Sequence, residues 1–195
     1  MMVSAIVLAG GRSTRFGRDK LAEPIDGIPL LWRTIDVVRA MADDIVVVTR
    51  PDASAALPAG VREVHDSRAD EGPLVGVLAG LAAARHDTAI IVGGDMPWVH
   101  PEVIGLMLAG LAGPPVATAV ALGSDGRRQQ LPIAVAREAA LAAGLALVDA
   151  GERRLGSLLE ALAATTLEES RWRALDPDAA TLRDVDVPED LPAQG

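Results

Sequence analysis

Short apolar runs alternate along this chain with longer stretches in which apolar residues recur at helical spacing. The short runs predict β-strands at 3–8, 44–49, 61–65, 88–92, 116–122 and 131–136. The longer stretches predict helices at 29–41, 74–85, 102–111, 137–148 and 155–163. Strand and helix thus follow each other repeatedly, which is typical of an α/β domain with a mostly parallel sheet and helices on both faces.

No internal repeat or linker divides the 195 residues, so we expect one Rossmann-like domain over residues 1–195. Ligands of such sheets bind beyond the carboxyl ends of the strands. Two glycine-containing segments follow predicted strands there: Gly10-Gly11 after the first, and Gly93-Gly94-Asp95 after the fourth. The pattern therefore places the candidate site at this edge of the sheet.

Charge and composition narrow the function. The net charge of −9 argues against an extended nucleic-acid surface, which needs a basic face. Aromatic residues make up 2% of the chain, so the core must be aliphatic. The absence of cysteine excludes disulfides and fits a cytoplasmic protein. No apolar run has membrane-spanning length, and the first residues resemble a buried strand, not a signal peptide.

Lys20 is the only lysine of the chain, whereas the other basic residues are arginines. It ends a loop that begins at Gly10-Gly11 and carries Arg12, Arg15 and Arg18. Glycines let backbone N–H groups approach phosphates, and guanidinium and ammonium groups neutralise them, so the loop predicts binding of a nucleoside triphosphate. It matches neither the P-loop nor the dinucleotide fingerprint.

The segment resembles the signature of the molybdenum cofactor guanylyltransferase family, nucleotidyltransferases of the sugar-nucleotide pyrophosphorylase type. The matching pattern is Leu8-Ala9-Gly10-Gly11-x-x-x-Arg15-x-Gly17-x-Asp19-Lys20. The resemblance implies the nucleotide-diphospho-sugar transferase fold. It also implies that Leu8, Ala9, Gly10, Gly11 and Lys20 bind nucleotide, and that Arg15 and Lys20 act in catalysis. The implied substrates are GTP and molybdenum-loaded molybdopterin, and molybdoenzyme-maturation proteins would be partners.

Three carboxylates complete the predicted site. Asp95 follows a buried strand, where a hard cation such as Mg²⁺ could bind, and the resemblance gives it that catalytic role. By the same resemblance, Asp66 and Gly76 belong to the nucleotide site, although Gly76 could instead serve close packing of helix on sheet. Asp186 is a candidate second metal ligand. The family commonly has Asn-x-Asn-Thr-Pro-Glu where this chain reads Asp184-Val185-Asp186-Val187-Pro188-Glu189.

The sequence says less about the residues that bind the acceptor and about which acceptor they bind. Arginines of two segments could meet an anionic acceptor or simply be solvated: Arg127, Arg128, Arg153 and Arg154. The departure at 184–186 keeps two related activities open, CTP with molybdopterin and GTP with a phospholactate-type acid. Two functions of other classes fit these residues less well. Lys20 and Asp95 argue against a non-catalytic nucleotide-binding regulator, and the arginine-rich loop gives no support to a purely structural protein.

Overall fold

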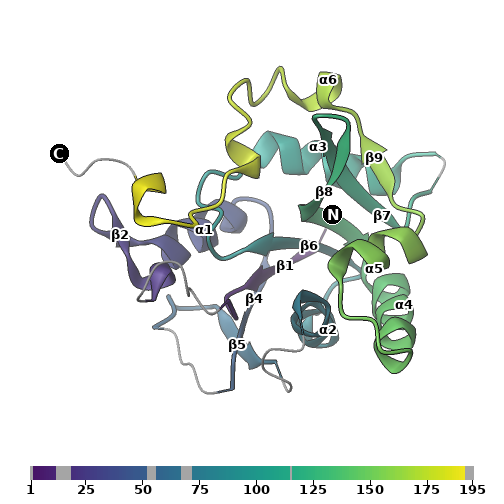
Figure 1. Cartoon of the computed structure of the whole chain (residues 1–195), viewed down its shortest axis with the longest axis horizontal. Helices are drawn as coiled ribbons and strands as arrows, with labels where there is room; N and C mark the ends of the chain where they lie inside the picture. The colour runs from purple at the N-terminus through teal and green to yellow at the C-terminus, as the bar shows by residue number, and fades with distance from the viewer. Residues whose placement is uncertain (1, 12–18, 52–55, 67–71, 115, 192–195) are drawn as a thin grey trace.

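A seven-stranded sheet in the order β5-β4-β1-β6-β8-β7-β9 forms the centre of the molecule (Figure 1). This computed structural model describes residues 2–11, 19–51, 56–66, 72–114 and 116–191. The strands are β1 (Val3–Leu8), β4 (Asp44–Thr49), β5 (Arg62–His65), β6 (Thr88–Gly93), β7 (Ala119–Ser124), β8 (Arg127–Ala136) and β9 (Thr165–Leu167). β8 is antiparallel to both of its neighbours, and the other pairings in the sheet are parallel.

The central strands are mostly apolar because helices cover both faces of the sheet. Ile6 of β1 lies opposite Val46 of β4 and Ile91 of β6, so these three strands end close together. Their carboxyl ends give rise to the loops that begin at Ala9, Arg50 and Gly94. The mostly parallel α/β fold with helices on both faces, which the sequence predicts, is confirmed.

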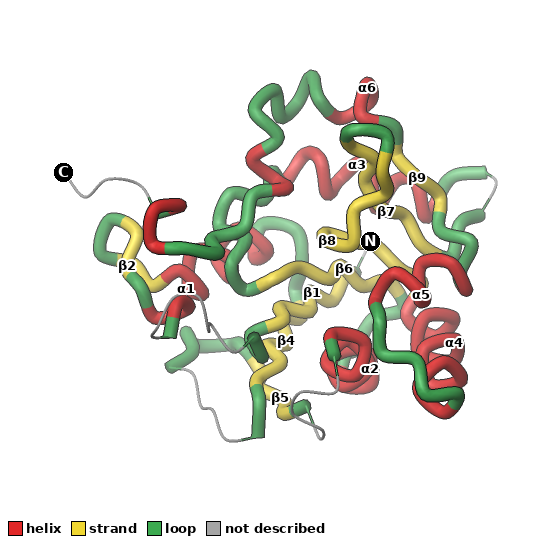
Figure 2. Tube along the Cα trace, in the orientation of Figure 1, coloured by secondary structure: helices red, strands yellow, loops and turns green. Residues whose placement is uncertain are grey.

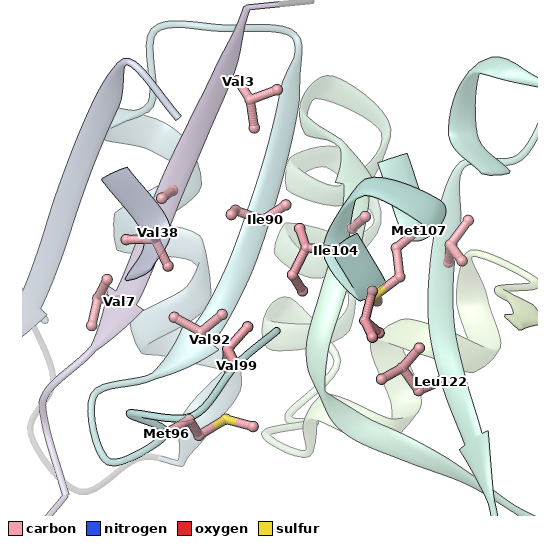
Figure 3. Packing of buried hydrophobic residues seen from close by; sticks show 14 of the residues in the cluster. Val3, Val7, Val38, Ile90, Val92, Met96, Val99, Ile104, Met107 and Leu122 are labelled. Carbon is pink, nitrogen blue, oxygen red and sulfur yellow. The ribbon is translucent and has the colours of Figure 1, made fainter. Parts of the chain in front are cut away.

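The helices form two layers, one on each face. The first layer contains α1 (Leu30–Arg39) and α3 (Pro101–Ala112), and the second α2 (Pro73–Ala83), α4 (Arg137–Asp149) and α5 (Leu155–Ala161). Figure 3 shows the core under the first layer, where Val38 of α1 and Ile104 of α3 lie near Ile90 and Val92 of β6. The core is almost wholly aliphatic, as the composition predicts.

α2 approaches the sheet most closely at Gly80. A Cβ atom there would collide with Ile6 Cγ2 and lie 3.1 Å from Val48 Cγ2. At Gly76, one turn earlier, the nearest atoms would be 3.7 Å or more away, which is ordinary contact. Close helix–sheet packing therefore depends on Gly80, and packing does not require glycine at position 76.

The hydrophobic pattern of the sequence does not predict several small elements of the structure (Figure 2). They are the β2 (Pro24–Ile25) and β3 (Ile28–Pro29) hairpin, the helix α6 (Glu169–Trp172) and the strand β9. The predicted strand at 131–136 also begins earlier, at Arg127, because Ser124 pairs with Arg127 and Gly123 with Arg128 in a hairpin. Its first four residues are polar, so periodicity gives no signal there. Within the described residues, none of the helices is both long and apolar enough to cross a membrane.

Candidate active site

The end of β1 is fixed to both of its neighbours. The Ala9 N–H donates to the Val48 carbonyl (2.8 Å), and the Leu8 carbonyl accepts from the Gly94 N–H (2.9 Å). Beyond them, and among the residues that the structure describes, a Cβ at Gly10 would meet only Arg50 Cγ, at 3.7 Å, and one at Gly11 would meet nothing within 4 Å. The described part of the fold therefore leaves room for side chains at both positions. Small residues here suit the approach of a ligand to the backbone.

Lys20 begins a short 3₁₀ helix, η1 (Lys20–Ala22), and this turn sets its direction. The Asp19 carboxylate accepts from the Leu21 N–H (3.1 Å) and so caps the turn. The ammonium of Lys20 donates to Asp95 Oδ2 (2.7 Å), to the Val185 carbonyl (2.8 Å) and to Asp186 Oδ1 (3.2 Å). Residues 20, 95 and 186 are thus brought together from three distant parts of the sequence.

Asp95 owes its position to the glycines that precede it. A Cβ at Gly93 would collide with Asp95 Oδ1, and one at Gly94 would lie 3.1 Å from the Leu8 carbonyl oxygen and 3.2 Å from Leu31 Cδ1. The Gly94 carbonyl accepts from Thr34 Oγ1 of α1 (3.0 Å). The loop is therefore held from both sides, and its carboxylate is fixed at the carboxyl end of β6.

Asp184 and Asp186 lie on one side of an extended segment that Val185 anchors. Val185 is fully buried against Ile25 and Leu30, its N–H donates to the Asp95 carbonyl (3.0 Å), and its own carbonyl accepts from Lys20. Alternate residues of an extended chain face the same side, so Asp184 and Asp186 both point away from that core. The Asp190 carboxylate accepts the N–H groups of Asp186 and Val187, which holds the following turn, η3 (Pro188–Asp190).

Asp95, Asp184 and Asp186 form what we call the carboxylate cluster. Each offers one oxygen, and these oxygens lie within 4.8 Å of one another. Burial and the charges of Asp186 and Asp95 raise the pKa of Asp184. Burial alone would lower the pKa of Lys20, but its hydrogen bonds and charge contacts with Asp95 and Asp186 outweigh this and raise it. Hard carboxylate oxygens grouped in this way are suited to Mg²⁺ together with phosphate oxygens.

Asp66 and Gly76 lie together on the other side of the β1 end. The Asp66 N–H donates to the Thr49 carbonyl (2.8 Å), which continues the β4–β5 pairing. A Cβ at Gly76 would lie 3.7 Å from Asp66 Oδ2 and 3.8 Å from Leu8 Cδ2. Asp66, Gly76 and Leu8 therefore form one group, and Leu8 connects it to the Asp95 loop through Gly94.

Two of the four candidate acceptor-side arginines, Arg153 and Arg154, contact other groups of the protein. Arg154 forms an ion pair with Glu152 (Nη2–Oε2, 2.8 Å), although its side chain is 81% exposed. Arg153 donates to the carbonyls of Val148 (2.8 Å) and Glu152 (2.9 Å). The Arg153 carbonyl accepts from the Leu74 N–H at the start of α2. This segment is thus fixed beside the first turn of α2.

The structure brings together Lys20, Asp95 and Asp186, whereas the sequence suggested only a pairing of Asp95 with Asp186. Arg15, and with it Arg12 and Arg18, lies outside the described residues, so its predicted role stays a prediction. Asp184 is the residue that the sequence reasoning missed as a cluster member. Its spacing of two from Asp186 in an extended segment was the available signal.

Comparison with known proteins places the chain in a family. The model of the MobA-like NTP transferase domain matches residues 5–167, more than half of the chain. The chain belongs to this family. Members of the MobA-like family are nucleotidyltransferases, so the chain is an enzyme of this class. The match contains the glycine loop, Lys20 and Asp95 but ends before Asp184 and Asp186.

Relatives that align with this chain over nearly its full length support its assignment to the family. A probable molybdenum cofactor guanylyltransferase of Chloroflexus aggregans is 35% identical over 98% of this chain and 92% of its own length. A molybdenum cofactor guanylyltransferase of Desulfosudis oleivorans is 30% identical over 97% and 92%. Among solved structures, the molybdopterin-guanine dinucleotide biosynthesis protein A of Archaeoglobus fulgidus superposes with a TM-score of 0.77 at 21% identity, covering 96% of this chain and 94% of its own. That likeness shows the fold.

Proposed function

We propose that this MobA-like enzyme, as one domain spanning residues 1–195, transfers a guanylyl group from GTP to molybdenum-loaded molybdopterin. An acceptor phosphate oxygen forms a bond to the α-phosphorus of GTP while the bond from that phosphorus to the bridging oxygen breaks. Pyrophosphate leaves, and molybdopterin guanine dinucleotide is formed. The contact of Lys20 with Asp95, 2.7 Å apart at the sheet edge beside the glycine loop, carries this proposal. The names of the two relatives that match nearly the full chain support the choice of GTP and acceptor.

The residues divide the work between binding and charge neutralisation. Leu8, Ala9, Gly10 and Gly11 would present backbone to the nucleotide, with Asp66 and Gly76 on its other side. Lys20 and Arg15 would neutralise charge that grows on the pyrophosphate. No general base is needed, because an acceptor phosphate with a second pKa of about 6 is already ionised near neutral pH.

Asp95 and Asp186 are the proposed metal ligands. Their oxygens fit a hard cation, and Mg²⁺ bound there would offset phosphate charge and orient the reacting groups. The protein would work in the cytoplasm and deliver its product to molybdoenzyme-maturation proteins.

The test is calorimetric binding of GTP, CTP, ATP and UTP with Mg²⁺, followed by pyrophosphate release with molybdopterin. Preference for GTP and release of pyrophosphate support the proposal. Preference for CTP would instead favour a cytidylyltransferase, the alternative that the aspartates at 184 and 186 keep open. Nucleotide binding without pyrophosphate release across a panel of phosphate-bearing acceptors would overturn the proposed catalysis.

A further inference from the structure

A positive charge of the protein itself lies within the carboxylate cluster. The ammonium of Lys20 contacts Asp95 at 2.7 Å and Asp186 at 3.2 Å, and its side chain is only 11% exposed. The Val185 carbonyl accepts a third hydrogen bond, at 2.8 Å. Asp184 belongs to the cluster, but none of these three hydrogen bonds goes to Asp184. Lys20 therefore holds two of the three carboxylates.

An ammonium and a divalent cation compete for these two carboxylates. Mg²⁺ binds oxygen at about 2.0–2.1 Å and demands near-octahedral geometry, so a bound ion would draw on the carboxylates that now accept from Lys20. Two cations at adjacent positions also repel each other. Lysine is suited to leaving, because its charge is compact and its stem is flexible.

We propose that Lys20 and the divalent cation occupy Asp95 and Asp186 in alternation. Lys20 holds these carboxylates while no nucleotide is bound, and it moves to the phosphates when metal and nucleotide enter together. This inference rests on the metal-binding part of the proposed function. It adds that metal and nucleotide bind together and not independently. Metal binds weakly to the protein alone, and nucleotide increases the affinity for metal by offering the ammonium another partner. Linkage requires that metal increase nucleotide affinity by the same factor.

The decisive measurement is Mn²⁺ affinity, by calorimetry and electron paramagnetic resonance, for the wild type, Lys20→Gln and Arg39→Gln. Both variants remove one positive charge, but Arg39 pairs with Asp36 on the surface of α1 (3.1 Å). Without nucleotide, we expect Lys20→Gln to bind Mn²⁺ about tenfold or more tightly than the wild type, and Arg39→Gln to match the wild type. With GTP present, the advantage of Lys20→Gln should disappear.

Three results would contradict the proposal in distinguishable ways. Equal or weaker Mn²⁺ binding by folded Lys20→Gln, with binding intact in the wild type, would overturn the exchange and leave the metal site standing. An equal gain in Arg39→Gln would reduce the effect to overall charge. If the wild type and Lys20→Gln fail to bind Mn²⁺ with and without GTP, the metal part of the proposed function fails as well. Thermal unfolding of each variant checks that it is folded.

The sole lysine offers a second readout on the unaltered protein. Labelling with ¹³C-lysine gives a single Cε environment, because Lys20 is the only lysine in the chain. We expect saturating Mg²⁺ with GTP to shift this signal, and Mg²⁺ at the same concentration without GTP to shift it less. A signal that stays at its position when metal and GTP are both bound would show that Lys20 never leaves the carboxylates, and would overturn the proposal.

Discussion

Two clusters of charged residues lie at opposite ends of the same sheet, and they differ in how their carboxylates are neutralised. At the amino end, Asp44 is buried and receives Ser4 Oγ (2.7 Å), the Arg85 N–H (3.0 Å) and the Arg62 guanidinium (2.6 Å). At the carboxyl end, the carboxylate cluster and Lys20 bring three acids to one base. Among the described residues, the first group pairs one acid with one base, whereas the second places three acids around one base.

The difference shows in the pKa values. Burial alone would raise the pKa of Asp44, but hydrogen bonds from Ser4 and Arg62 and the Arg85 N–H outweigh it and lower the pKa. Burial and neighbouring aspartates raise the pKa of Asp184. Folding thus favours the charged form of Asp44 and disfavours that of Asp184. A carboxylate whose pKa is raised by neighbouring carboxylates is typical of a functional site, where a bound cation would favour the charged form.

The largest effect should come from Asp44→Asn. Removing the charge leaves Arg62 without its buried partner, which should lower the free energy of unfolding by about 3 kcal/mol. Turnover by the fraction that remains folded should be unchanged, because the residue lies at the far end of the sheet. Denaturant unfolding and pyrophosphate release measure the two quantities, and a large loss of turnover with intact stability would contradict this.

Acid should reveal the same contribution in the wild type. Because the pKa of Asp44 is lowered by folding, its stabilisation is complete above the unfolded value of about 3.9 and is lost as pH falls through the folded value. In Asp44→Asn, the free energy of unfolding should therefore fall less steeply below pH 4. Parallel curves for the two proteins would mean that Asp44 makes no such contribution.

Asp95→Asn should have the opposite profile. We expect turnover to fall on the order of a hundredfold, because the metal and Lys20 each lose one of their charged partners. This fall corresponds to about 2.7 kcal/mol of transition-state stabilisation. Stability should change little, since Lys20 keeps the Val185 carbonyl and Asp186. Near-normal pyrophosphate release would exclude Asp95 from the catalytic group.

Asp184→Asn should raise the free energy of unfolding slightly at pH 7 without metal, by less than about 1 kcal/mol, since it removes one of three like charges. The folded pKa of Asp184 is raised, so the destabilisation by its charge appears as pH rises above the unfolded value and is absent below it. The variant and the wild type should therefore converge near pH 3. A destabilised variant at pH 7 would contradict the expectation that the charge of Asp184 is unfavourable in the folded protein.

Arg39→Gln should have the smallest effect and serves as the baseline. Its ion pair with Asp36 is exposed, so the free energy of unfolding should change by no more than about 0.5 kcal/mol. Turnover and nucleotide affinity should match the wild type. A larger change would mean that charge anywhere on the surface affects the site, and the contrast between the two sheet ends would lose its meaning.

The sequence predicted the alternation of strands and helices because the central strands, such as β1 and β6, form mostly apolar runs. Polar or very short elements, such as the start of β8 and the strand β9, gave no such signal because pairing with a neighbour creates them. Of the candidate site, Lys20 and Asp95 were recognisable because each follows a glycine-containing turn after a strand. The role of Gly80, and the clearance at Gly76, depend on helix–sheet distance, which periodicity does not contain.

The sequence alone determined the fold class, the loop that carries the single lysine, and the resemblance that led to a nucleotidyltransferase. These depend on local order: apolar runs, glycines and charged residues at fixed spacing. Only the tertiary structure decided that Asp184 joins Asp95 and Asp186, and that Lys20 lies among them. Residues 20, 95 and 184–186 meet because burial of Val185 against Ile25 and Leu30 brings the C-terminal segment to the sheet edge, a contact over more than 150 residues that no local pattern encodes.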